Sequence, residues 1–179
     1  MRIISGTLGG RVLHPPKGLP VRPTTDFAKT ALFNILASRL DLEESSVLDL
    51  CCGTGSISFE CASRGAKKIT AVDAHFNCAK FVNDTAKAMG MINLQAFKAD
   101  IFKFIEKETH VYDLIFVDPP YEVAWITQIS DAVFQYKILS LNGILIVEHG
   151  SKTDLSASKG FVEKRKYGNV NFSIFKHYE

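Results

Sequence analysis

A glycine turn between a short apolar run and a helical pattern most constrains the fold of this chain. The run at 47–50 is followed by Gly53 and Gly55, and then by a helical pattern at 56–64 that stops at Gly65. A strand, a glycine turn and a helix in this order begin a βαβ unit. Short β-branched runs alternate with helical segments along the rest of the sequence. This alternation predicts an α/β fold built on a mostly parallel sheet.

The other elements are expected in a regular order. The spacing of apolar residues predicts a helix within 24–40 that Thr24 or Thr25 caps. Strands are expected at 47–50, 68–72, 93–98, 112–117 and 143–147, with helices at 56–64, 76–89, 101–108 and 123–139. Alternating residues at 161–167 and 171–177 predict an antiparallel hairpin, which gives a seven-stranded sheet. Residues 1–22 are expected to form a small β-hairpin extension, and residues 23–179 one Rossmann-like domain.

Acidic residues follow or end the first three expected strands. Asp49, Asp73 and Asp100 would therefore meet beyond the carboxyl ends of the sheet, where open α/β folds bind ligands. The predicted cofactor residues are Asp49, Gly53, Gly55, Asp73, Ala74, Asp100 and Ile101. The Asp73 carboxylate is expected to accept hydrogen bonds from two ribose hydroxyls. The Asp100 carboxylate is expected to accept one from an adenine amino group. A dinucleotide fingerprint requires a glycine where Ser58 stands, and Asp49 would repel a pyrophosphate, so S-adenosylmethionine is favoured over NAD.

Asp118-Pro119-Pro120-Tyr121 ends the fourth apolar run and predicts the chemistry. The exocyclic amine of a nucleobase is a poor nucleophile because its lone pair is delocalised into the ring. Asp118 and the Pro119 carbonyl would each accept one N–H, which directs the lone pair toward a methyl donor. Tyr121 would stack on the base. Asp118, Pro119 and Tyr121 are thus the predicted catalytic residues of a methyl transfer to a base nitrogen.

Composition indicates an ordinary globular protein. The sequence is 46% hydrophobic and 22% charged, with a net charge of +2, so a nucleic-acid surface would have to be a local patch. The four cysteines form no C-x-x-C pair, which favours reduced thiols in a cytoplasmic protein and no metal site. No apolar run approaches the length of a membrane span. A monomer is expected.

Basic residues gather in the first 30 positions, where no acid precedes Asp26. They are Arg2, Arg11, Lys17, Arg22 and Lys29. A cluster of this kind favours a phosphate-binding extension over a merely solvated terminus.

Several segments together resemble the bacterial small-subunit ribosomal RNA guanine-N2 methyltransferases of the D type. These are 2–6, Gly10-Arg11, 22–26, 31–34, 49–55 and 118–121, in that order. The resemblance implies a class I methyltransferase fold, S-adenosylmethionine as donor, and a guanine of 16S ribosomal RNA in an assembled or assembling small subunit as acceptor. Arg22, Thr24 and Asp26 match the amino-terminal signature of that family, which is expected to border the active site. With the basic cluster, this makes Arg2, Arg11, Arg22, Thr24 and Lys29 the residues predicted to contact RNA. Residues 27–30 depart from the Arg-Val-Arg-Glu common in that family, which alters the expected RNA contacts.

Three other functions remain open from the sequence. An adenine-N6 DNA methyltransferase also uses D-P-P-Y, although 179 residues leave little room for duplex recognition. A protein-glutamine methyltransferase generally has Asn at the position of Asp118. A catalytically silent RNA-binding assembly factor would keep the fold without the reaction.

Overall fold

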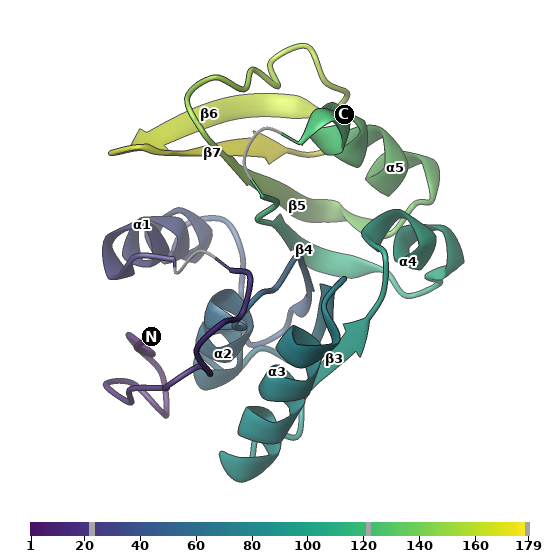
Figure 1. Cartoon of the computed structure of the whole chain (residues 1–179). Coiled ribbons are helices and arrows are strands. Elements are labelled where there is room, and N and C mark those ends of the chain that lie inside the picture. Colours follow the sequence, from purple (N-terminus) through teal and green to yellow (C-terminus); the bar gives the residue numbers. More distant parts are fainter. Residues whose placement is uncertain (22–23, 121–122, 178–179) are drawn as a thin grey trace.

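The computed structural model describes residues 1–21, 24–120 and 123–177, and a seven-stranded sheet forms its centre (Figure 1). The strands are β1 (Ser46–Leu50), β2 (Lys68–Asp73), β3 (Leu94–Lys98), β4 (Tyr112–Val117), β5 (Leu139–His149), β6 (Phe161–Tyr167) and β7 (Val170–Phe175). They lie in the order β3-β2-β1-β4-β5-β7-β6, in which β1 to β5 are parallel and β7 is antiparallel to both neighbours. The predicted mostly parallel sheet with a terminal antiparallel hairpin is confirmed.

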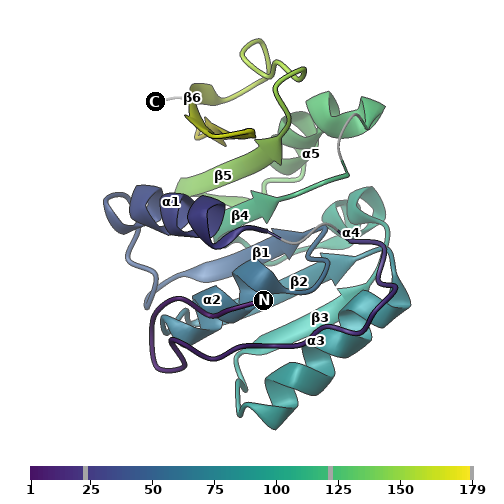
Figure 2. The same ribbon diagram turned by 60° about the vertical axis from the view of Figure 1, so that its left-hand side comes forward.

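Helices cover both faces of the sheet (Figures 1 and 2). They are α1 (Asp26–Ala37), α2 (Ser56–Ser63), α3 (Phe76–Ala88), α4 (Ile101–Lys107), the 3₁₀ helix η1 (Ala124–Gln128) and α5 (Ile129–Gln135). One apolar core joins α1, α2 and α3 to one face, and a second joins α4 and α5 to the other. No helix in the described ranges is long and apolar enough to cross a membrane.

Burial on both faces explains why the central strands are apolar. All residues of β1 after Ser46, and all of β4 except Asp113, are buried. Their register pairs Leu50 with Val117, and Val117 with Val147 of β5. The parallel strands therefore end along one edge of the sheet, and the segments that follow them lie side by side there.

The segment after β4 differs from the predicted helix at 123–139. The structure has η1, then α5 ending at Gln135, and β5 already begins at Leu139. Lys137 has a φ of 55°, which a continuing α-helix does not allow. The strand predicted at 143–147 is longer at both ends because Leu139 pairs with Tyr112 and His149 pairs with Asn171.

The N-terminal segment is a minimal hairpin that packs on α2. A single antiparallel bridge joins Arg2 and Val12, supported by a hydrogen bond from the Ile3 N–H to the Arg11 carbonyl of 2.9 Å. Gly6 has a φ of 82°, and a Cβ there would lie 1.9 Å from the Ser63 carbonyl oxygen. A residue with a side chain would therefore displace the segment from the end of α2.

Candidate active site

A cavity of about 580 Å³ lies beyond the carboxyl ends of the parallel strands. Its lining comes from the turn after β1, the ends of β2, β4 and β5, the first turn of α4, and the segment that leads into α1. Of the predicted site residues in the described ranges, it brings together Asp49, Gly53, Thr24, Asp73, Ala74, Asp100, Ile101, Asp118 and Pro119. The strand-end acids therefore share one site, as the sequence predicted.

Asp49 lies on β1 and is 1% exposed. One of its carboxylate oxygens accepts hydrogen bonds from the Ser58 N–H at 3.2 Å and the Ser58 hydroxyl at 2.5 Å. Burial raises the pKa of Asp49 to about 7, and the nearby carboxylates of Asp118 and Asp73 act in the same direction, while the Ser58 hydrogen bonds oppose the rise. Ser58, which breaks the dinucleotide fingerprint, is thus a hydrogen-bond donor to the acid of the turn.

The two glycines of the turn have different roles. Gly53 lines the cavity, and its N–H donates to Asp73 Oδ2 at 2.8 Å. Gly55 does not line it, and its N–H donates to the Cys52 carbonyl at 2.7 Å. A Cβ on Gly55 would lie 2.7 Å from Val82 Cγ2, and its φ is 76°. Gly55 is therefore required by the turn and by packing on α3, and the structure gives it no direct approach to a ligand.

Asp73 ends β2 and is 6% exposed. Its two oxygens accept the N–H groups of Gly53 and His75, each at 2.8 Å. A carboxylate offers about four acceptor positions, so these contacts orient Asp73 and leave capacity for hydroxyl groups in the cavity. Ala74 and His75 line the same part of the cavity and are exposed.

The opposite wall combines an acid with apolar side chains. Asp100 caps α4 by accepting the Lys103 N–H at 3.0 Å, and Ile101 follows it, buried. Phe102 and Trp125 line the cavity in edge-to-face contact, with ring centroids 5.6 Å apart. Trp125 is half-buried in this wall. A planar ring placed here would meet apolar side chains with Asp100 at its edge.

Asp118 and Pro119 follow β4 directly. The Asp118 N–H donates to the Leu50 carbonyl at 3.3 Å, which holds the residue against the end of β1. Asp118 is half-buried in the cavity wall, and Pro119 is buried. The strand end thus fixes a carboxylate beside the Asp49 and Asp73 end of the cavity. Tyr121, the third predicted catalytic residue, lies outside the described residues.

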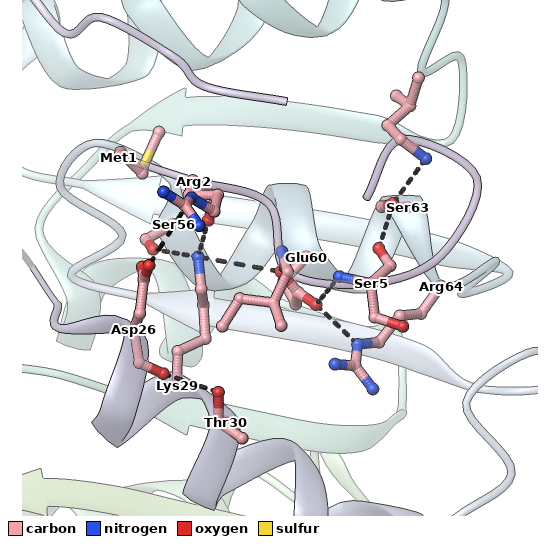
Figure 3. A network of polar contacts seen from close by, with 12 residues as sticks. Met1, Arg2, Ser5, Asp26, Lys29, Thr30, Ser56, Glu60, Ser63 and Arg64 are labelled. Carbon is pink, nitrogen blue, oxygen red and sulfur yellow. Dashed lines mark hydrogen bonds and ion pairs between the residues drawn. The ribbon is translucent and has the colours of Figure 1, made fainter. Parts of the chain in front are cut away.

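The predicted RNA-contacting residues that the structure describes lie in three different settings. Arg2 and Arg11 are exposed on the N-terminal segment, and Thr24 lines the cavity; Arg22 lies outside the described residues. Lys29 is 1% exposed, so the prediction that it contacts RNA is wrong. Its ammonium points inward from α1, where it donates to the Arg2 carbonyl and to Ser56 Oγ, and pairs with Glu60 at 3.8 Å (Figure 3).

Several parts of the cavity wall were not predicted, and two of them bear on function. Pro20 and Val21 form one part, which the N-terminal segment contributes. Glu148 forms another; it is 5% exposed near the end of β5. A signal for Glu148 was present in the sequence, because it follows an apolar run in the same way as Asp73 and Asp118. Pro20 and Val21 carry no comparable signal.

Comparisons with known proteins show the family of this chain. The family model described as conserved hypothetical protein 95 matches residues 1–176. Ribosomal RNA small subunit methyltransferase D of Haemophilus influenzae is 27% identical over 184 residues, which cover 99% of this chain and 94% of that protein.

Solved structures show the same fold. A hypothetical protein of Thermus thermophilus superposes with a TM-score of 0.84 at 19% identity, covering 99% of each chain. Coclaurine N-methyltransferase, solved with N-methylheliamine and SAH, superposes with a TM-score of 0.55 at 22% identity, covering 71% of this chain and 36% of that one. The predicted class I methyltransferase fold is confirmed. Because its family model spans nearly the whole sequence, the chain belongs to the family described as conserved hypothetical protein 95, and its resemblance to the D-type small-subunit ribosomal RNA methyltransferases is confirmed.

Proposed function

We propose that this protein transfers a methyl group from S-adenosylmethionine to the exocyclic N2 of a guanine in 16S ribosomal RNA. The observation that carries the proposal is the meeting of Asp49, Asp73, Asp100 and Asp118 in one cavity at the strand ends. Family membership and the name of the Haemophilus influenzae relative support ribosomal RNA as the acceptor. The choice of guanine N2 rests on the resemblance of the motifs.

The cavity fits S-adenosylmethionine by the chemistry of its walls. Asp49 offers a negative charge to a cationic methionine moiety, and Asp73 offers acceptors to ribose hydroxyls. Asp100 lies where an adenine amino group could be bound, beside Ile101 and Phe102. When bound, this cofactor supplies a methyl group already activated on a sulfonium.

The residues of the chain then have to position and neutralise the acceptor amine. Asp118 accepts one N–H of the guanine N2, and the Pro119 carbonyl accepts the other, so the nitrogen lone pair points along the axis of transfer. The N2–carbon bond forms as the sulfur–carbon bond breaks, and positive charge appears on N2. Asp118 stabilises this charge and takes the released proton. Tyr121 is proposed to stack on the base.

We assign the N-terminal extension to RNA contact. Arg2 and Arg11 are exposed on it, and Thr24 stands at the cavity wall, where a base would enter. Arg22, between them in sequence, remains part of this proposal. The base is swung out of its stack to reach Asp118. The protein is proposed to act as a monomer, in the cytoplasm, on an assembled or assembling small subunit.

A methyl-transfer assay tests the function. The protein and labelled S-adenosylmethionine are incubated with small subunits that lack the modification, with naked 16S RNA and with duplex DNA, and the methylated nucleoside is identified. N2-methylguanine in the RNA of the subunit is expected. Methyladenine as the sole product would contradict the proposal and favour an adenine-N6 enzyme. Absence of transfer to every substrate would favour a silent assembly factor.

The pH dependence of cofactor binding is a further prediction. Because the pKa of Asp49 is raised to about 7, its carboxyl is largely neutral at pH 6 and ionised at pH 8. The cationic cofactor should bind the ionised form better, so its affinity should rise between these values and binding at pH 6.5 should release a proton. Calorimetry in buffers of different ionisation enthalpy measures this release. Asp49→Asn should bind more weakly and release no proton; an unchanged proton count in that variant would contradict the assignment.

A further inference from the structure

Glu148 is a second acid beside the proposed acceptor site. In the register of β4 and β5, Val117 pairs with Val147, so Asp118 and Glu148 are the next residues on adjacent parallel strands. Neighbouring strands lie about 4.8 Å apart. Both residues line the cavity, and Glu148 is 5% exposed. Two carboxylates therefore stand side by side at this edge of the sheet.

The strand order separates Glu148 from the cofactor side of the cavity. Asp49 and Asp73 belong to β1 and β2, Asp118 follows β4, and Glu148 is on β5 beyond it. Asp118 thus stands between the proposed cofactor site and Glu148. A base whose amine contacts Asp118 would extend toward β5, where Glu148 pairs in register with Phe172 of β7.

The place of Glu148 near the end of β5 exposes its carboxylate to the cavity. The positions just before it, from Ile144 to Val147, are all apolar and fully buried. Glu148 ends this apolar run where the strand reaches the cavity wall. Its carboxylate is therefore placed to accept a hydrogen bond from a ligand in the cavity.

We infer that Glu148 selects guanine by accepting the hydrogen bond of its N1–H while Asp118 accepts from N2. This inference rests on the proposed function. The N1–H and the N2 amine of guanine are neighbouring donors on one edge of the base, and they match two adjacent carboxylates. Adenine and cytosine carry a ring-nitrogen lone pair next to their exocyclic amine. A carboxylate at Glu148 repels that lone pair, so it disfavours both bases while accepting guanine.

A substrate without the N1–H tests this role. Small subunits are assembled from RNA that carries 2-aminopurine at the guanine that the wild-type protein methylates; this base keeps the 2-amino group but has a lone pair at N1. Wild-type protein is expected to prefer guanine over 2-aminopurine by about 10–100-fold in kcat/KM, as for a lost hydrogen bond to a charged group. In Glu148→Gln the side-chain amide can donate to N1, so the preference should fall to roughly threefold or less.

Asp113→Asn is the matched control. Asp113 is a carboxylate at the opposite end of β4, where it accepts from the Ser46 N–H at 2.9 Å and from Ser140 Oγ at 2.9 Å. This variant should keep the wild-type preference. Cofactor affinity, measured by calorimetry, should be unchanged in Glu148→Gln, because the substitution lies outside the cofactor side of the cavity.

The outcomes separate this inference from the proposed function. If wild-type protein forms no N2-methylguanine, the proposed function fails. If it does form N2-methylguanine but uses both bases equally, or if Glu148→Gln keeps the full preference, the role of Glu148 is wrong. The wild-type comparison decides even where the variant fails to fold, and Glu148→Asp, which retains the charge on a shorter side chain, should still reject 2-aminopurine.

Discussion

Asp118→Ala is expected to lower the rate of methyl transfer by about 10²–10⁴-fold while leaving cofactor affinity within about twofold of wild type. The carboxylate is fixed at the end of β4 by the hydrogen bond of its N–H to the Leu50 carbonyl, and it lines the cavity. In the proposed mechanism it contacts the acceptor amine and not the cofactor. Single-turnover transfer to unmodified small subunits measures the rate, and calorimetry measures the affinity.

Asp73→Asn is the matched control for this prediction. Asp73 is another strand-end acid of the same cavity, but its oxygens accept the N–H groups of Gly53 and His75 on the cofactor side. Its replacement should weaken cofactor binding first, and saturating cofactor should restore much of the rate. Equal loss of rate and affinity in both variants would contradict the division between an acceptor side and a cofactor side.

The sequence predicted the strand-end acids well because parallel strands end at one edge of the sheet. Once the order of strands and helices was known, Asp49, Asp73, Asp100 and Asp118 had to meet there, whatever the details of packing. The two glycines of the turn were harder to separate. Pattern alone cannot distinguish Gly53, which faces the cavity, from Gly55, whose hydrogen atom leaves room for Val82 of α3.

Residues whose roles depend on distant contacts were not predictable in this way. Lys29 was assigned to RNA because basic residues gather near the N-terminus, yet its direction depends on Glu60, 31 positions away, and on the Arg2 carbonyl. The prediction of one helix at 123–139 was wrong for a local reason, because nothing in the spacing of apolar residues indicates the positive φ of Lys137. The burial of a charged side chain such as Lys29 can be predicted only when the residue that neutralises its charge is known to lie beside it.

Glu60→Ala is expected to destabilise the protein by about 3–5 kcal/mol, because it leaves the buried Lys29 ammonium without its ion-pair partner. Glu60 is 0% exposed; it accepts the N–H groups of Ile4 and Ser5 at 2.7 and 3.0 Å and also pairs with Arg64 at 2.8 Å (Figure 3). For a chain of this length the loss corresponds to a melting temperature lower by roughly 10 °C. Thermal unfolding followed by circular dichroism measures it.

Lys29→Met is the matched control, and it should cost less than Glu60→Ala. When Lys29 is removed, Glu60 keeps Arg64 and the two backbone N–H groups; when Glu60 is removed, Lys29 keeps neutral partners in the Arg2 carbonyl and Ser56 Oγ. Burial already lowers the pKa of Lys29, against the opposing attraction of Glu60, so removing the acid should lower it further. The double variant should be more stable than Glu60→Ala alone, since it removes the uncompensated charge.

Because the same acid holds the N-terminal segment on α2, Glu60→Ala should also expose residues 1–13 to proteolysis and raise KM for the small subunit more than it changes cofactor affinity. A melting temperature of Glu60→Ala within about 2 °C of that of the wild type would show that the Lys29–Glu60 pair does not hold the N-terminal segment in place.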